Sequence, residues 1–305
     1  TLPAGVVLLT WRLTYRAAPL RSLGLCVAIG EGAPLGAESP AMIFTGALAA
    51  WLGKLFRCTA AESRGLFIAG ACSALAGMFG APVAAVFLAL EVLLPEWTAA
   101  AIIPVAVAAA TAGAGSYLLR GAAPVYSMPE GPPPEKAALL AYLAIGLLMG
   151  LWSALAVRLS AWISKWLGKL TAASRWYLLT AAAATGIAAY IFPAVTGTGS
   201  YYINDLLHAH VTLSLLFALG VVKLIAWLLF SGAYKTGTGF TPLLVTGGAM
   251  ALLIGVIIQL LFPSVIIPSG MIVLTGMGAM LCGTSRALLT SIVFCLEITR
   301  HGQAA

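Results

Sequence analysis

The sequence predicts an all-α polytopic membrane protein whose helices are broken, and three observations predict it. Of its 305 residues, 61% are hydrophobic and 8% are charged, whereas a soluble domain carries about 25% charged residues. Long stretches contain no Asp, Glu, Lys or Arg, namely residues 97–119, 137–157, 176–204 and 236–285. The 33 Gly and 16 Pro residues indicate interrupted helices. This composition argues against a soluble enzyme, a disordered chain and a nucleic-acid-binding module.

The net charge of +7 has a simpler explanation than a nucleic-acid partner. Basic residues cluster between the apolar stretches, as at Arg12, Arg16 and Arg21. This pattern is typical of loops and helix ends held at one membrane face. The five cysteines show neither a Cys-x-x-Cys pair nor Cys/His spacing for a metal, so we expect no metal site and no disulfide framework.

Along the chain, the stretches 97–119 and 137–157 each fit one spanning helix of about 20 residues. Residues 121–136 form the clearest loop, and they separate a first repeat at 1–120 from a second at 137–305 within a single transmembrane domain. The stretch 236–285 has room for two helices, but Gly and Pro interrupt it, so we expect pieces shorter than a span. Such breaks at membrane depth are tolerated only where the backbone is buried or lines a cavity.

The two parts of the chain resemble each other at two offsets in residue number. At the first offset, 202, the matches are Arg21 with Lys223, Gly30 with Gly232, Pro40 with Pro242, Gly46 with Gly248, and Gly53 with Gly255. At the second offset, 206, they are Gly70 with Gly276, Gly77 with Gly283, Ala81 with Ala287, Leu90 with Leu296, and Glu91 with Glu297. The paired glutamates carry most weight because acids are scarce here. Repeats with interrupted segments at matching positions predict a transport site where the repeats meet.

The first interrupted segment places an acid at a helix start. Gly36, Ala37, Glu38, Ser39 and Pro40 directly precede an apolar run, and Pro40 suits the first helical turn. The N–H groups and the dipole of such a start attract anions. A carboxylate at that point competes with a mobile anion for the same amides, and its protonation releases them. We therefore predict that Glu38 acts as a gate. The simpler alternative is that it caps the helix at the water interface.

The matching segment of the second repeat predicts the other half of an anion site. Gly237, Thr238, Gly239, Phe240 and Thr241 precede a second apolar helix that begins near Pro242. Two helix starts aimed at one point would bind a dehydrated anion without a fixed positive charge that holds it too tightly. Glycines allow the backbone to approach the ion closely.

These segments together resemble the CLC family of chloride channels and proton/anion antiporters, in the family's order and over nearly the whole chain. The segments are GAESP, GACSALAGMFGAPVAAVFLALEVLLPEW, GTGSYYI, SGAYKTGTGFTP and GMGAMLCGTSRALLTSIVFCLEIT. The resemblance implies a CLC-like inverted repeat of broken, tilted and re-entrant helices. It puts Glu38 on the family's gating glutamate and Phe240 on an anion-coordinating position.

The sequence departs from the family's pattern at several positions. Ala37 replaces the usual basic residue and Ser39 the second glycine, while Thr238 and Gly239 shift a glycine by one place. Val92 stands where proton-transporting members usually carry a second glutamate, beside the matching acid Glu91. The family's serine-bearing anion motif is expected before residue 1, and its last helices, with the anion-coordinating tyrosine, beyond Ala305.

The resulting hypothesis is CLC-type transport of anions, chiefly chloride, through a pore gated by Glu38. Val92 favours a channel, voltage-gated in the family's manner; the alternative is a coupled proton/chloride or proton/fluoride antiporter, with Glu91 as a candidate on the proton path. An enzyme is not expected, because no second catalytic group accompanies Glu38. The expected partners are the lipid bilayer, small inorganic anions and a second subunit in a homodimer, with no nucleic acid and no cofactor besides the transported ion. The expected location is the cell (inner) membrane, which the chain crosses several times.

Overall fold

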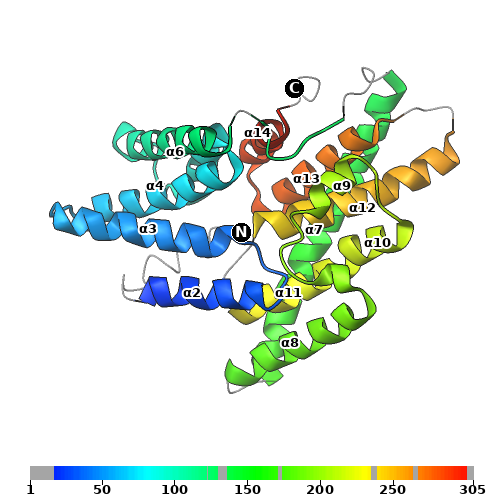
Figure 1. Ribbon diagram of the computed structural model, residues 1–305, viewed down its shortest axis with the longest axis horizontal. Helices are drawn as coiled ribbons and strands as arrows, with labels where there is room; N and C mark the ends of the chain where they lie inside the picture. The colour runs from blue at the N-terminus through cyan, green and yellow to red at the C-terminus, as the bar shows by residue number, and fades with distance from the viewer. Residues whose placement is uncertain are drawn as a thin grey trace. The chain divides into compact units, whose positions relative to one another are not determined.

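A computed structural model of the chain describes residues 17–121, 123–129, 136–170, 174–234, 239–263 and 267–300. Over these residues the chain forms helices and loops and contains no strand (Figure 1). The α-helices are α2 (Ala17–Gly30), α3 (Glu38–Leu55), α4 (Ala60–Phe79), α5 (Pro82–Leu88), α6 (Ala99–Arg120), α7 (Lys136–Leu170), α8 (Ser174–Ile191), α9 (Tyr202–Leu207), α10 (Leu213–Phe217), α11 (Lys223–Tyr234), α12 (Phe240–Leu261), α13 (Ser269–Ser285) and α14 (Leu288–Thr299). Short π-helices η1 (Ala89–Leu93) and η3 (Ala218–Val222) and the 3-10 helix η2 (Pro193–Val195) join some of them.

Four of the described helices are long and apolar enough to cross a membrane. They are Ala99–Arg120, Ala138–Lys165, Leu213–Gly232 and Phe240–Leu261. Shorter apolar helices stand beside them in the sequence, including α5 with η1, α13 and α14. The predicted fold class, an all-α membrane protein that mixes full spans with short helices, is confirmed.

One expectation for the stretch 236–285 is wrong. Its first helix, α12, runs unbroken for 22 residues, so it is long enough to cross the membrane. The glycines inside it do not interrupt it, because they face a neighbouring helix. A Cβ at Gly247 would lie 2.6 Å from the Met280 Cβ, and one at Gly255 would lie 2.7 Å from the Ile272 Cδ1. These glycines allow α12 and α13 to pack backbone against backbone.

Helix boundaries repeat at the two offsets found in the sequence. Helix α3 begins at Glu38 and α12 at Phe240, which is the first offset. Helix α4 ends at Phe79 and α13 at Ser285, which is the second offset. Helices α5 and α14 begin at Pro82 and Leu288, again at the second offset. The repeat therefore governs where helices start and stop.

Helix α14 and the helix formed by α5 and η1 cap each other through the paired glutamates. Glu91 accepts the backbone N–H groups of Leu289 (3.0 Å) and Thr290 (2.8 Å), and the Thr290 hydroxyl (2.6 Å). Glu297 accepts those of Val83 (3.1 Å) and Ala84 (2.8 Å). Each acid lies near the end of one helix and holds the start of the other, so the two helices run antiparallel. The donors also match at the second offset, so a local two-fold relation joins the repeats here, as an inverted repeat requires.

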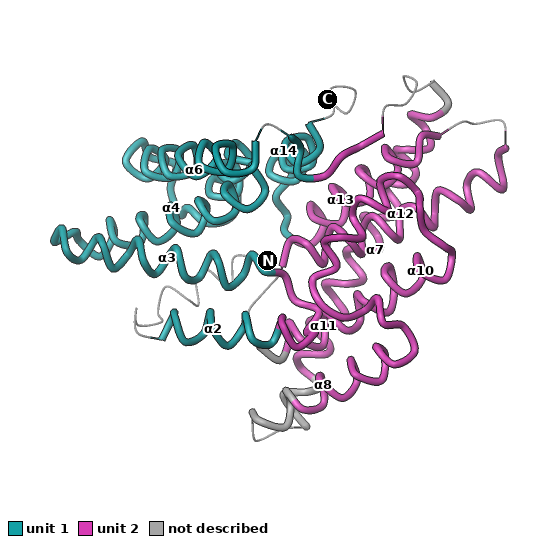
Figure 2. Tube along the Cα trace, viewed as in Figure 1, with its two compact units in different colours: residues 1–28, 37–125, 285–300 teal, residues 29–36, 126–284, 301–305 magenta. Residues whose placement is uncertain are grey.

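The described residues fall into two compact units (Figure 2). Unit 1 comprises residues 1–28, 37–125 and 285–300, which include α3 to α6 and α14. Within it α3 packs closely on α4, since a Cβ at Gly70 would lie 2.5 Å from the Thr45 carbonyl oxygen. Phe79 meets Phe294 edge to face, with ring centroids 5.0 Å apart.

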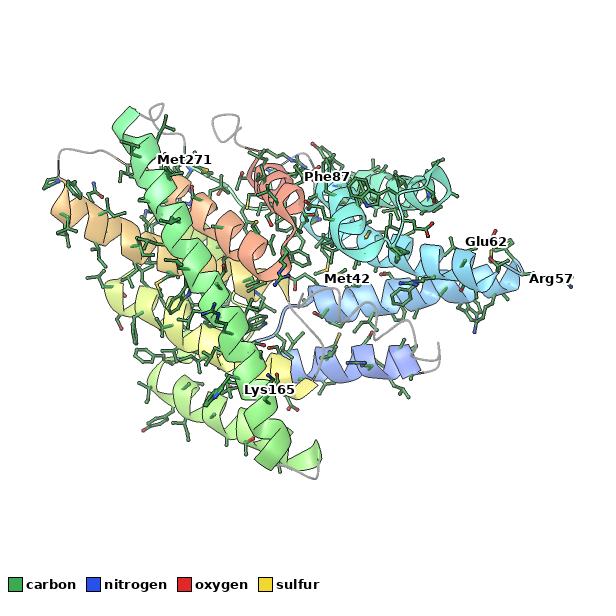
Figure 3. The ribbon with its side chains drawn as sticks, turned by 180° about the vertical axis from the view of Figure 1, so that it is seen from behind. Met42, Arg57, Glu62, Phe87, Lys165 and Met271 are labelled. Atoms are coloured by element: carbon green, nitrogen blue, oxygen red, sulfur yellow. The ribbon has the colours of Figure 1, made fainter. Side chains whose placement is uncertain are left out.

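The turn that joins α3 to α4 is fixed by a capping box. The Thr59 N–H donates to Glu62 Oε2 (2.7 Å), and the Glu62 N–H donates to Thr59 Oγ1 (3.3 Å). The Thr59 backbone N–H, and then its hydroxyl, hold the pKa of the exposed Glu62 carboxyl below its ordinary value. Arg57 and Glu62 lie at this end of the helix pair (Figure 3).

Unit 2 comprises residues 29–36, 126–284 and 301–305, which include α7 to α13. Its apolar interior contains Trp227, Leu244 and Met277, each fully buried. These units are not the two sequence repeats, because α14 of the second repeat belongs to unit 1. The predicted division at residues 121–136 stays a prediction; residues 123–129 form no helix and α7 begins at Lys136.

The contact between α12 and α13 yields a prediction about stability. A Cβ at Gly276 would collide with the Ala251 Cβ and lie 2.6 Å from the Gly247 carbonyl oxygen. Gly276→Ala is expected to lower the free energy of unfolding by about 1–3 kcal/mol, because the backbones must separate. Thermal unfolding of the detergent-solubilised protein measures this. Gly146→Ala is the control, since a Cβ there meets nothing within 4 Å; equal melting temperatures for both variants would contradict the close packing.

The reciprocal caps yield a second prediction. Both oxygens of Glu91 and of Glu297 accept hydrogen bonds, so a glutamine at either place turns an NH2 group toward an N–H group. Glu91→Gln and Glu297→Gln are each expected to cost about 1–3 kcal/mol of stability. Because both acids join the same two helices, the double variant should lose less than the sum. The exposed Glu96, changed to Gln, is the control; strict additivity would show that the two caps are independent.

Candidate functional site

Helix α3 begins with a buried acid. Glu38 is its first residue and is 1% exposed, and the following Ser39 is 8% exposed. The N-cap residue is Ala37, which has no side-chain group to cap the helix. Ser22 of α2 donates its hydroxyl to the Pro40 carbonyl (3.0 Å), and this bond fixes the first turn of α3. The chain thus holds a carboxyl group inside the protein at the positive end of a helix.

Helix α12 begins in the same way, although without an acid. Its N-cap residue is Gly239, and Phe240 and Thr241 of its first turn are 3% and 4% exposed. As at α3, the N-cap residue itself makes no side-chain hydrogen bond to this start. Gly237 and Thr238, which belong to the predicted site, lie outside the described residues. The helix start is buried, so its dipole acts in surroundings that screen it little.

The segment that leads into α3 touches the start of α12. A Cβ at Gly239 would overlap the Gly36 Cα and the Gly36 nitrogen. The two glycine backbones are therefore in direct contact, and Glu38 comes shortly after Gly36 in the sequence. Gly239 has φ −80°, which any residue can adopt, so the close approach of the backbone and not its conformation requires glycine here. The sequence predicts both glycines as residues of the anion site, but it contains no signal that they touch.

Glu91, the candidate for a proton path, lies in η1 and is committed to the start of α14. Its neighbour Val92 contributes no titratable group. A role for Glu91 in proton transfer stays a prediction. In the described part of the chain, no three His, Cys, Asp or Glu side chains gather in a way that could hold a metal ion.

Known proteins resemble this chain over almost its full length. The family model described as voltage gated chloride channel matches residues 6–305. This chain belongs to the CLC family. An H(+)/Cl(-) exchange transporter ClcA of Vibrio vulnificus is 30% identical over 294 residues, which are 94% of this chain and 63% of the relative. The one from Salmonella typhi is 26% identical over 298 residues and is likewise covered to 63%. The chain thus spans somewhat less than two thirds of these relatives.

Solved structures show the same fold. A slow cyanobacterial Cl−/H+ antiporter matches 99% of this CLC chain and 78% of its own, with a TM-score of 0.85 and 23% identity. A CLC-type fluoride/proton antiporter matches 90% of this chain and 67% of its own, with a TM-score of 0.76 and 21% identity. The CLC fold predicted from the order of the motifs is confirmed.

The contact between Gly36 and Gly239 leads to a prediction about transport. Gly239→Ala is expected to lower anion flux by between about tenfold and a hundredfold, because the backbone at a helix start must move by about 1 Å. Flux from proteoliposomes measures this effect. Gly24→Ala in α2 is the matched control, since a Cβ there meets nothing within 4 Å. Wild-type flux in Gly239→Ala would show that this contact does not shape the pathway.

Proposed function

We propose that this chain forms the anion pathway of a CLC-type transporter that exchanges chloride for protons across a membrane. The observation that carries the proposal is the buried carboxyl group of Glu38 at the first residue of α3, shortly after the glycine that touches the start of α12. A buried acid at a helix start in a membrane protein is a functional group by default, because burying its charge is costly.

The start of α12 supplies the chemistry for a dehydrated anion. Backbone N–H groups and the positive end of the helix dipole favour a small negative ion. They carry partial charges, so the ion is held without being trapped, as conduction requires. That the start of α3 contributes amides to the same anion stays a prediction.

Glu38 acts as the switch. When ionised, its carboxylate carries the same charge as the anion and occupies a place where an anion is attracted. When protonated, it loses that charge and gives way. The same group therefore takes up one proton when an anion enters, which links the two movements.

Coupled exchange of chloride and protons is favoured over the channel that Val92 alone suggests. The channel hypothesis rests on Val92, which is a single position. The relatives that match most of this chain bear the name H(+)/Cl(-) exchange transporter, at up to 30% identity. That name supports coupled exchange, and it supports chloride in preference to fluoride as the transported anion. The voltage-gated character expected of a channel receives no support from it.

The proposed membrane location is supported by the same relatives. The chain is a multi-pass membrane protein, and the bacterial relatives support the cell inner membrane as its place. We further propose that it works as a homodimer with one anion pathway in each subunit. A transporter of this kind needs no cofactor and catalyses no covalent reaction.

The proposal predicts the behaviour of Glu38→Gln. Glutamine has the size of a protonated glutamate and cannot ionise, so anion flux should become independent of pH, and proton movement should cease. Chloride and proton fluxes from proteoliposomes, at an acidic and a neutral pH, measure both. Glu96→Gln is the control, since Glu96 is an exposed acid.

Two results would overturn parts of this proposal. If Glu38→Gln keeps the wild-type pH dependence, Glu38 is not the switch. If a pH gradient leaves the reversal potential of the wild type unchanged, protons are not coupled and the channel is the better description. Comparing chloride, fluoride and nitrate in the same vesicles tests the choice of anion.

A further inference from the structure

Lys223 is a fully buried cation that the proposed transport mechanism does not use. It is the first residue of α11, and its side chain is 0% exposed. Taking an ammonium group out of water costs several kcal/mol unless hydrogen bonds compensate. The burial of a lysine at this position therefore requires a structural or functional explanation. In the sequence, Lys223 is distinguished only as the repeat partner of Arg21, which is half-buried.

Three backbone carbonyl oxygens surround the ammonium group. Nζ donates to Val195 (2.9 Å), Thr196 (3.2 Å) and Gly197 (2.9 Å). An ammonium group has three N–H donors, so each carbonyl takes one. Among the residues that the structure describes, no carboxylate pairs with it. Among the described residues its donors are therefore engaged by backbone carbonyls and by no acid.

The loop at 195–199 is shaped around this ammonium group. Gly197 and Gly199 have φ +64° and +76°, in the left-handed region that favours glycine. A Cβ at Gly199 would lie 2.9 Å from the Lys223 Cε and 3.2 Å from Nζ. A side chain at Gly199 would thus push the lysine away from its carbonyls. The loop and the lysine form one unit, which the GTGS sequence makes possible.

This loop in turn holds the segment that leads to the candidate site. The Gly197 N–H donates to the Gly32 carbonyl oxygen (2.9 Å). Gly32 has φ +100°, and a Cβ there would lie 3.5 Å from the Thr196 Cβ. One short stretch later, Gly36 lies against Gly239 at the start of α12. All these contacts lie within unit 2.

We propose that Lys223 is a positioning residue for anion transport. Its ammonium group fixes the carbonyls of residues 195–197, and through Gly197 it fixes the segment 32–36 against the start of α12. Its engaged N–H groups also keep it from binding an anion directly. This inference rests on the proposed function, since it assigns a role in the same pathway.

The test compares Lys223→Met and Lys223→Arg with wild type in proteoliposomes. The anion concentration at half-maximal flux and the maximal flux are measured separately, and thermal unfolding reports folding. We expect Lys223→Met to raise the half-maximal concentration about tenfold. Lys223→Arg keeps the charge and the donors, so it should stay within about threefold of wild type. Lys165→Met is the matched control, since Lys165 is an exposed lysine of α7 (Figure 3).

The outcomes separate this inference from the proposed function. If the wild type moves no anion, or Glu38→Gln keeps the wild-type pH dependence, the proposed function fails. If both behave as proposed but folded Lys223→Met keeps the wild-type half-maximal concentration, Lys223 only stabilises the fold and the inference is overturned. If Lys223→Met does not fold, Lys223→Gln, which retains an NH2 donor for the carbonyls, takes its place and is judged by the same two results. An equal loss of affinity in Lys223→Arg also overturns it.

Discussion

The structure depends on how backbone N–H groups are satisfied where helices start in apolar surroundings. Each helix leaves its first N–H groups without a partner inside the helix, and a bilayer core offers no water to replace one. Helix α14 and the helix formed by α5 and η1 solve this with carboxyl groups, each provided by the other helix. Helices α3 and α12 have no side chain at the N-cap position that accepts these groups. The fold thus closes two helix starts with carboxyl groups, and under the proposed function the starts of α3 and α12 are where a mobile anion and the Glu38 carboxyl act.

The repeat explains why the two kinds of helix start come in pairs. The starts of α3 and α5 recur at the two offsets as the starts of α12 and α14, so each kind of helix start has its counterpart in the other repeat. The second offset is larger because α12, with 22 residues, is longer than α3, with 18 residues, and this extra length leaves the paired starts intact. One acid is not repeated, because Glu38 corresponds to Phe240. Only one of the two paired helix starts therefore carries a titratable group, which fits the single proton switch that we propose.

The sequence predicted the fold class and the two helix starts, because charge scarcity, Gly/Pro placement and repeated motifs are local signals, whereas the gating role of Glu38 stays a prediction. The prediction from the sequence failed for the glycines of α12, which it treated as breaks. Glycine both ends helices and allows them to touch, and only the neighbour decides which: Gly255 lies against Ile272, and Gly239 lies against Gly36. The hydrogen-bond partners of Glu91 and of Lys223 could likewise not be predicted, because most of them are backbone groups, which every residue has. The match of Lys223 with Arg21 across the repeat predicts a basic residue at this position. It does not predict that three carbonyl oxygens accept hydrogen bonds from that residue.

The placement of charge also explains how a chain with 8% charged residues can handle ions. A cation that faced the anion directly would hold it tightly, and an uncharged interior would repel it. Lys223 avoids the first extreme, because its three donors are engaged by Val195, Thr196 and Gly197. Under the proposed function, Lys223 positions the segment 32–36, and local binding falls to the weaker backbone groups at the start of α12. The proposed pathway thus holds the anion by partial charges alone, with Glu38 as the proposed switch.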